Sequence, residues 1–213
     1  MIASNGSPDT VSYKTFDWVN IHVCSTSPKM KVQSEDAALI LVDIQNAWKS
    51  EAWGRRNNPE AERVAGRLLE DFRKKGLRVI HVRHESVNPK SLFRNGKDTF
   101  GFQDYVMPLS GETIITKHVN SAFIGTELEE LLRREGIRSI LICGMVTDHC
   151  VSTTARMAGN LGFDTTIIED ACATFDRKDS AGEVIPAGIV HRVNLASIRG
   201  EFAAVIKSGD IQM

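Results

Sequence analysis

The sequence predicts an α/β fold in which a mainly parallel sheet carries helices on both of its faces, a three-layer doubly wound arrangement. Short apolar runs of strand length alternate with longer segments whose apolar residues recur every three or four positions. Such alternation of strands and helices is typical of parallel sheets that are covered on both sides. The length of 213 residues suits one large domain of this kind.

The expected strands are short apolar runs with polar or turn residues at their ends. They cover residues 37–44, 77–83, 113–116, 139–144, 164–169 and 203–207. Helices are expected over residues 59–75, 125–135, 148–161 and 191–199. Pro59 suits the first turn of a helix, and Gly76, Gly136 and Gly162 suit the position just after a helix end. Residues 84–112 form a connection long enough to act as a lid or a pocket wall.

Composition and charge narrow the class of protein. The net charge is −1 and the charges are spread evenly, which argues against nucleic acid or an anionic membrane as a partner. The four cysteines lack metal-site or C-x-x-C spacing, as in reduced proteins of the cell interior. No apolar run reaches membrane-spanning length, and the first residues do not resemble a secretory signal. We expect a cytoplasmic protein that acts on a small molecule.

Residues 1–36 are polar and are expected to form an extension or arm before the domain at 37–213. This segment also carries a few large apolar side chains with little local core to cover them, namely Tyr13, Phe16, Trp18 and Ile21. We therefore expect a homo-oligomer, a dimer or a multiple of one.

The most informative stretch of the chain surrounds Cys150. The strand at 139–144 ends at Gly144, and helical periodicity begins at Val151. Cys150 thus lies in the first turn of a helix, where backbone N–H groups and the helix dipole stabilise a thiolate. A cysteine nucleophile fits this position; a small buried apolar residue is the alternative.

Two more polar residues follow predicted strands. Asp43 comes after the first strand and Lys117 after the third. Ligands of open parallel sheets bind beyond the carboxyl ends of the strands, so an acid, a cation and a thiol are expected at one edge. A carboxylate can take the thiol proton while an ammonium balances the charges. Taken singly, Asp43 also fits a turn or cap, and Lys117 fits a solvated surface position.

The motifs at these three positions resemble those of the isochorismatase-like cysteine hydrolase family. They read Leu-Val-Asp43-Ile-Gln-Asn, Thr-Lys117-His-Val-Asn-Ser-Ala-Phe and Cys-Gly-Met-Val-Thr-Asp-His-Cys150-Val-Ser-Thr-Thr-Ala-Arg. The resemblance runs from about residue 36 to residue 207. It implies a catalytic triad of Asp43, Lys117 and Cys150 and a strand order of 3-2-1-4-5-6, with strands 1 and 4 adjacent at the switch point.

The resemblance also implies a non-proline cis peptide bond between Met145 and Val146. In the family this bond turns the following N–H group toward the substrate. The N–H groups of Val146 and Cys150 would then form the oxyanion hole, which holds the charged oxygen of a tetrahedral intermediate.

Two departures from related enzymes bear on the chemistry. Nicotinamidases of the family carry an Asp-x-His metal pair after the second strand, where this chain reads His84-Glu85-Ser86. Adjacent residues on an extended segment point apart, so we predict no metal site and no cofactor. Isochorismatases that cleave a vinyl ether generally lack the nucleophilic cysteine. Its presence here favours thiol chemistry on a carbonyl group.

Four further residues are candidates for substrate binding. Gln45 and Asn120 could hydrogen-bond an amide, or they could satisfy loop backbone instead. Trp48 and Phe123 could form the apolar wall of a small pocket, with core packing as the alternative. Asp148 is expected to cap the helix that follows it.

These expectations combine into one function. The chain is predicted to be a metal-independent cysteine hydrolase that cleaves the C–N bond of a small amide or ureide through a thioester. An isochorismatase-type vinyl-ether hydrolase is the alternative within enzymes, and a non-catalytic binding member of the family is the alternative outside them.

Overall fold

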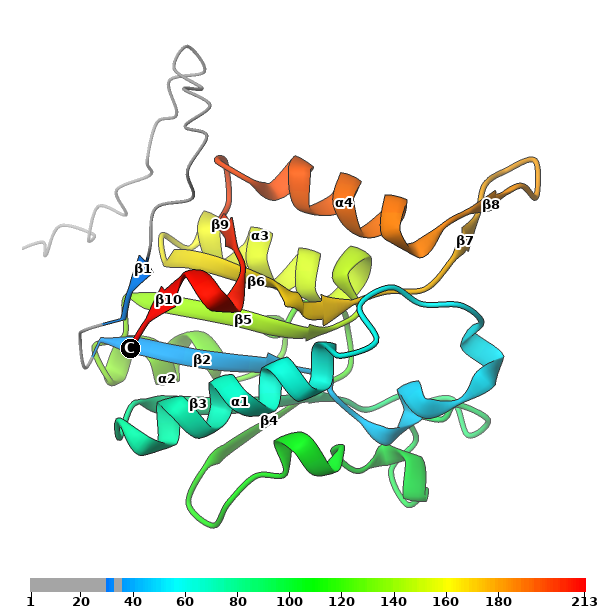
Figure 1. The fold of residues 1–213 in the computed structure, drawn as a ribbon. Coiled ribbons are helices and arrows are strands. Elements are labelled where there is room, and N and C mark those ends of the chain that lie inside the picture. The colour runs from blue at the N-terminus through cyan, green and yellow to red at the C-terminus, as the bar shows by residue number, and fades with distance from the viewer. Residues whose placement is uncertain (1–29, 33–35) are drawn as a thin grey trace, which may run out of the picture.

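The computed structural model describes residues 30–32 and 36–213, which are organised around a six-stranded parallel sheet (Figure 1). Its neighbouring strands follow the order β4-β3-β2-β5-β6-β9. Numbered along the chain within this sheet, that order is 3-2-1-4-5-6, so the predicted order is confirmed. The strands are β2 (Ala37–Val42), β3 (Arg78–His84), β4 (Thr113–Lys117), β5 (Ser139–Met145), β6 (Asp164–Ala173) and β9 (Ala204–Ile206).

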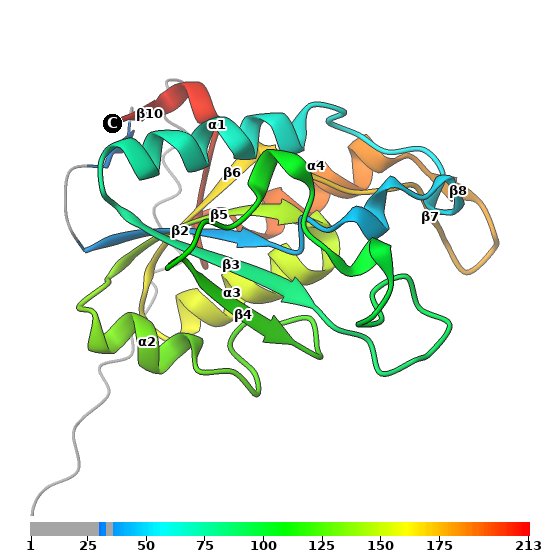
Figure 2. The same ribbon diagram turned by 90° about the horizontal axis from the view of Figure 1, so that it is seen from below.

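Helices cover both faces of this sheet, as predicted. Figure 2 shows α1 on one face and α2 and α3 on the other. The last helix, α4, packs against α3. The helices are α1 (Ala61–Lys74), α2 (Leu128–Arg134), α3 (Ser152–Asn160) and α4 (Ala187–Ile198).

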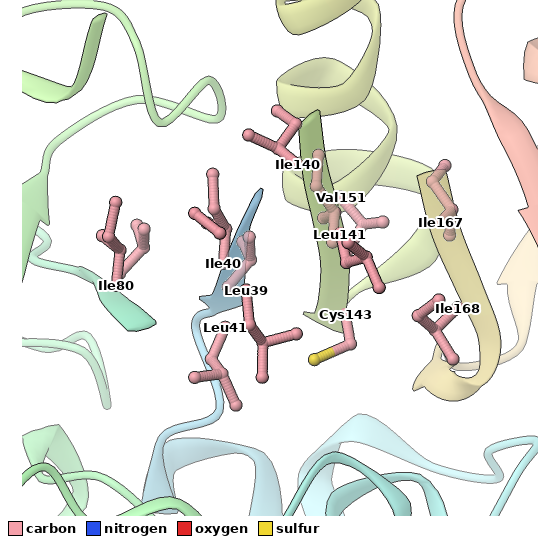
Figure 3. Packing of buried hydrophobic residues seen from close by; sticks show 14 of the residues in the cluster. Leu39, Ile40, Leu41, Ile80, Ile140, Leu141, Cys143, Val151, Ile167 and Ile168 are labelled. Carbon is pink, nitrogen blue, oxygen red and sulfur yellow. The ribbon is translucent and has the colours of Figure 1, made fainter. Parts of the chain in front are cut away.

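The core is built around the two central strands, β2 and β5. All six residues of β2 are buried, which agrees with its continuous apolar sequence. Figure 3 shows Leu39, Leu41 and Leu141 of these strands among the packed side chains. Because Leu39 is fully buried, replacing it with alanine should cost about 2–5 kcal/mol of unfolding free energy.

Several element ends differ from those predicted. The first strand ends at Val42 because Asp43 has a φ of 53° and leaves the extended conformation. The third helix begins as a π-helical turn, η5 (Thr147–Val151), before α3. The last helix begins at Ala187, directly after Pro186 and four residues before the predicted start at 191.

The long connection between β3 and β4 is packed against the domain. Its buried side chains include Phe93, Phe100 and Phe102, and it contains the short turns η3 (Asp98–Phe100) and η4 (Asp104–Val106). A glycine in α1 permits its close approach, since a Cβ atom on Gly66 would lie 2.7 Å from the Tyr105 carbonyl oxygen. Its role as a pocket wall or lid stays a prediction.

Most of the predicted arm, including Tyr13, Phe16, Trp18 and Ile21, lies outside the described residues. Residues Met30–Lys31 form β1, which pairs in parallel with β10 (Ile211–Gln212). A short antiparallel hairpin of β7 (Arg177–Lys178) and β8 (Val184–Ile185) projects from the body before α4 (Figure 1). Within the described residues, no helix is long and apolar enough to cross a membrane.

Candidate active site

The side chains of Asp43, Lys117 and Cys150 meet at the carboxyl edge of the sheet. They come from the end of β2, the end of β4 and the turn after β5. The Nζ atom of Lys117 lies 2.6 Å from Oδ2 of Asp43 and 3.3 Å from Sγ of Cys150. It also donates to the carbonyl oxygen of Val119 at 3.2 Å. These three partners account for all three hydrogens of the ammonium group.

Asp43 is held in an unusual conformation and is fully buried. Its φ of 53° lies in the left-handed region, which residues other than glycine occupy at some energetic cost, often at functional sites. Its carbonyl oxygen accepts a hydrogen bond of 2.8 Å from Nε1 of Trp48. Its Oδ1 atom is buried without a hydrogen-bond partner among the described residues. The Asp43 carboxylate is therefore paired with Lys117 through one oxygen, Oδ2.

A glycine allows the segments that carry Asp43 and Cys150 to approach each other. Gly144 has a φ of 133°, and a Cβ atom at this position would lie only 2.0 Å from the carbonyl oxygen of Val42. Any other residue would push β5 away from the end of β2. Gly144 therefore sets the spacing between the two ends on which the site is built.

Cys150 lies on the π-helical turn η5, and only 7% of the residue is exposed. Its thiol points to Oδ1 of Asn120 at 3.8 Å. Burial raises the pKa of the Cys150 thiol well above its ordinary value, and Asp43 adds to the rise while Lys117 opposes it. The expected stabilisation of a thiolate at the helix start is thus outweighed. This rise in pKa favours the neutral thiol over the thiolate.

Lys117 keeps its charge despite complete burial. Burial disfavours the ammonium form, but the Asp43 carboxylate, with a further contribution from Cys150, outweighs it and raises the pKa of Lys117. The site therefore contains a buried ion pair with a thiol beside it.

The segment between β5 and Cys150 contains the backbone groups proposed for an oxyanion hole. The peptide bond between Met145 and Val146 is cis. The N–H group of Val146 directly follows this bond, and the N–H group of Cys150 lies in the first turn of η5. The N–H groups of a first helical turn are those that lack intrahelical partners.

Two of the four residues predicted to bind substrate, Gln45 and Phe123, are occupied by contacts within the protein. The amide of Gln45 is fully buried; Nε2 donates to the carbonyl oxygens of His84 and Phe100, and Oε1 accepts from His84 N at 2.8 Å. Its hydrogen-bonding capacity is used by loop backbone. Phe123 is buried in the main core and stacks on Phe163 with ring centroids 5.9 Å apart. Gln45 thus makes the loop-backbone hydrogen bonds, and Phe123 the core packing, that were the alternatives to substrate binding.

The other two candidates, Asn120 and Trp48, lie beside Cys150 and Asp43 respectively. Asn120 is exposed next to the Cys150 thiol. Trp48 is half-buried in an aromatic group with Trp53, Phe93 and Phe175, and its ring centroid is 4.8 Å from those of Trp53 and Phe93. This group packs with Met145 and Val146 on one side of the site.

Sequence reasoning missed what Asp148 does. No side chain caps the turn η5, and the Asp148 carboxylate instead binds Thr174 and Arg177. The predicted helix cap is therefore wrong. Nothing in the local sequence signals these partners, which lie 26 and 29 residues further along the chain.

His84 lies in the stretch that corresponds to the nicotinamidase metal pair. Burial and the nearby Lys117 charge lower the pKa of His84, which favours a neutral ring. Within residues 30–32 and 36–213, no group of three or more His, Cys, Asp and Glu side chains is arranged to hold a metal ion. The absence of a metal requirement stays a prediction.

Comparison with known proteins identifies the family. The isochorismatase domain model matches residues 37–207. The chain belongs to the isochorismatase family. An isochorismatase family protein of Bacillus subtilis, YrdC, is 45% identical over 177 residues, which cover 83% of this chain and 95% of that protein. A solved isochorismatase-family structure from Chromobacterium violaceum aligns with a TM-score of 0.84 and 43% identity, covering 87% of this chain and 96% of the other.

Other members of the isochorismatase family bear the names of hydrolases and amidases. Streptothricin hydrolase of Streptomyces noursei is 32% identical over 162 residues, which cover 73% of this chain and 56% of that protein. The structure of N-carbamoylsarcosine amidase from Thermoplasma acidophilum aligns with a TM-score of 0.66 and 25% identity, over 83% of this chain and 99% of the other. This chain is thus an isochorismatase-family hydrolase with amidases among its relatives.

Proposed function

We propose that this protein is a cysteine hydrolase that cleaves the C–N bond of a small amide, ureide or related carbonyl compound through a thioester. One observation carries the proposal: the buried ammonium of Lys117 contacts both a carboxylate and a thiol, and one oxygen of that carboxylate has no partner in the part of the chain that the structure describes. The amidase and hydrolase names among the relatives support the same chemistry.

In the first half of the reaction, Asp43 takes the proton of Cys150 and the sulfur attacks the substrate carbonyl carbon. The N–H groups of Val146 and Cys150 hold the resulting oxyanion. The C–N bond then breaks, and Asp43 passes its proton to the departing nitrogen. Ammonia or an amine leaves, and the acyl group stays on Cys150 as a thioester.

In the second half, a water molecule attacks the thioester carbonyl while Asp43 removes one of its protons. The second tetrahedral intermediate collapses with cleavage of the C–S bond. Cys150 recovers a proton from Asp43, and the carboxylic acid product departs. Lys117 stays protonated throughout, so its charge faces the carboxylate or the thiolate, whichever carries the negative charge.

The surroundings of the thiol bear on substrate choice. Asn120 offers an amide within reach of a group bound at Cys150, and Trp48 offers a partly exposed aromatic surface on the side of Val146. A small planar carbonyl compound with a hydrogen-bonding substituent matches this combination.

The test is a screen of small amides and ureides for released ammonia, with wild-type protein, Cys150→Ala and Cys143→Ala. We expect release by the wild type and by Cys143→Ala, and none by Cys150→Ala, with a substrate-derived mass on Cys150 in stopped reactions. Release by Cys150→Ala at the wild-type rate would disprove the covalent route. Hydrolysis of isochorismate by Cys150→Ala would favour the vinyl-ether reaction, and inactivity of the wild type in both assays would favour a binding role.

A further inference from the structure

The turn that presents Cys150 is tied to other elements by hydrogen bonds of two side chains, besides the contacts of Cys150 itself, and by the packing of Val151 in the main core. It follows the cis peptide bond directly, and no side chain caps its first turn. These two side chains are those of Thr147 and Asp148. The Oγ1 atom of Thr147 lies 2.8 Å from Nδ1 of His191 on α4. Asp148 points the other way, to the segment that follows β6.

Both oxygens of the Asp148 carboxylate are engaged. Oδ1 accepts a hydrogen bond from Thr174 Oγ1 and another of 3.2 Å from Arg177, and Oδ2 accepts from Nε of Arg177 at 2.7 Å. The side chain of Asp148 is only 8% exposed. With both oxygens bound to Thr174 and Arg177, the Asp148 carboxylate serves to hold the turn.

Thr174, which binds the Asp148 carboxylate, is itself held by hydrogen bonds to Asn57. The N–H group of Thr174 donates to Oδ1 of Asn57 at 2.7 Å, and the N–H group of Asn57 donates to the Thr174 carbonyl at 3.1 Å. Thr174 is fully buried. The carboxylate thus ties the nucleophile's turn to a fixed point of the backbone and not to a loose surface loop.

We infer that Asp148 is a positioning residue of the active site: by binding Thr174 and Arg177 it holds the turn so that Cys150 stays in contact with Lys117. The inference rests on the proposed role of Cys150 as the nucleophile. The thiol-to-ammonium contact of 3.3 Å joins two separate elements, so a small shift of the turn would break it. Without that contact the thiol loses the one group that opposes the rise of its pKa.

Alkylation of Cys150 by iodoacetamide, followed by intact mass and peptide mapping over a range of pH, tests this without a known substrate. Asp148→Ala releases the turn, so we expect alkylation at neutral pH to slow about tenfold, as if the profile moved up by about one pH unit. Asp148→Asn keeps the Oδ1 acceptor for Thr174, so we expect a rate within about threefold of wild type. Both variants remove the Asp148 charge, so a difference between them reports the loss of the hydrogen bond to Thr174 and not the loss of the charge.

The matched control is the ion pair of Arg73 and Glu112, which is remote from the site. Its side chains are 24% and 15% exposed, against 29% and 8% for Arg177 and Asp148. Glu112→Ala should lower thermal stability and leave alkylation unchanged. An unchanged or faster rate in Asp148→Ala, or equal slowing in Asp148→Asn and Glu112→Ala, would overturn the inference. A wild-type protein that iodoacetamide labels elsewhere but not on Cys150 would instead contradict the proposed nucleophile.

Discussion

Replacement of Lys117 by methionine should damage both the stability and the chemistry of this protein. Methionine fills a similar volume but removes the buried charge that Asp43 faces at 2.6 Å. Both side chains are fully excluded from solvent, and Oδ1 of Asp43 has no other partner among the described residues. The variant therefore leaves a carboxylate in the interior with no cation beside it.

The size of the effect follows from this burial. Removal of one partner from a buried pair costs about 3–5 kcal/mol, because the remaining charge is left uncompensated. Loss of proton transfer between Asp43 and Cys150 should lower kcat by about 100-fold or more. The acidic limb of the pH–rate profile should move to higher pH, because a buried carboxylate without a cation holds its proton more tightly. Lys117→Arg keeps the charge but not the compact shape, so its loss of activity should be smaller.

Urea unfolding measures the stability, and ammonia release from the amide selected in the screen measures the activity. The double variant Asp43→Asn with Lys117→Met removes both charges, so it should regain most of the lost stability and remain inactive. A Lys117→Met protein with wild-type stability and an unshifted pH profile would show that Lys117 is a bystander. A double variant as unstable as the single one would show that packing, and not charge, explains the loss.

Three further outcomes are expected. Dialysis against a chelator should leave activity unchanged, and stoichiometric zinc or iron in elemental analysis, with activity restored by re-addition, would contradict this. Light scattering should give a homo-oligomer at micromolar concentration, and deletion of residues 1–29 should weaken assembly more than it disturbs the domain; a wild-type monomer would contradict this. Burial opposes the charge of Glu112, but Arg73 and the Leu109 N–H group outweigh it and lower the pKa of Glu112 to about 2. The contribution of ionised Glu112 to the free energy of unfolding should be fully present above about pH 4.5 and lost as the pH falls toward 2. It should be absent in Glu112→Gln. Equal acid sensitivity of the wild type and Glu112→Gln in urea unfolding would refute this.

Much of the fold was predictable because its signals are local or repetitive. The six strands of the main sheet contain short apolar runs, which in β2 extend over all six residues, and Gly76, Gly136 and Gly162 mark the chain reversals after three helices, each with a positive φ. The strand ends also placed Asp43, Lys117 and Cys150 at one edge, since parallel strands share their carboxyl edge. Strands and helices can be located from local sequence patterns without knowing which side chains contact one another.

The errors concern side chains whose partners are distant in sequence. Gln45 follows the motif aspartate, but its amide binds the backbone of His84 and Phe100, which are 39 and 55 residues away. Asp148 has the residue type of a helix cap, yet it lies inside the π-helical turn, two residues after the N-cap residue Val146, and Arg177 binds its carboxylate. Whether a polar group meets substrate or backbone depends on the loops that surround it, and no local pattern records this.

The retention of a buried ion pair is itself informative about function. A pair such as Asp43 and Lys117 gains little stability over apolar side chains of similar volume, because desolvation offsets the attraction between the charges. Here one oxygen of the carboxylate has no partner within residues 30–32 and 36–213, which adds a further cost. An arrangement that serves the fold poorly is understandable if the proton must pass between Cys150 and Asp43 without a change in net charge. The expected gain in stability of the uncharged double variant over Lys117→Met, at the expense of all activity, expresses that conflict between stability and chemistry.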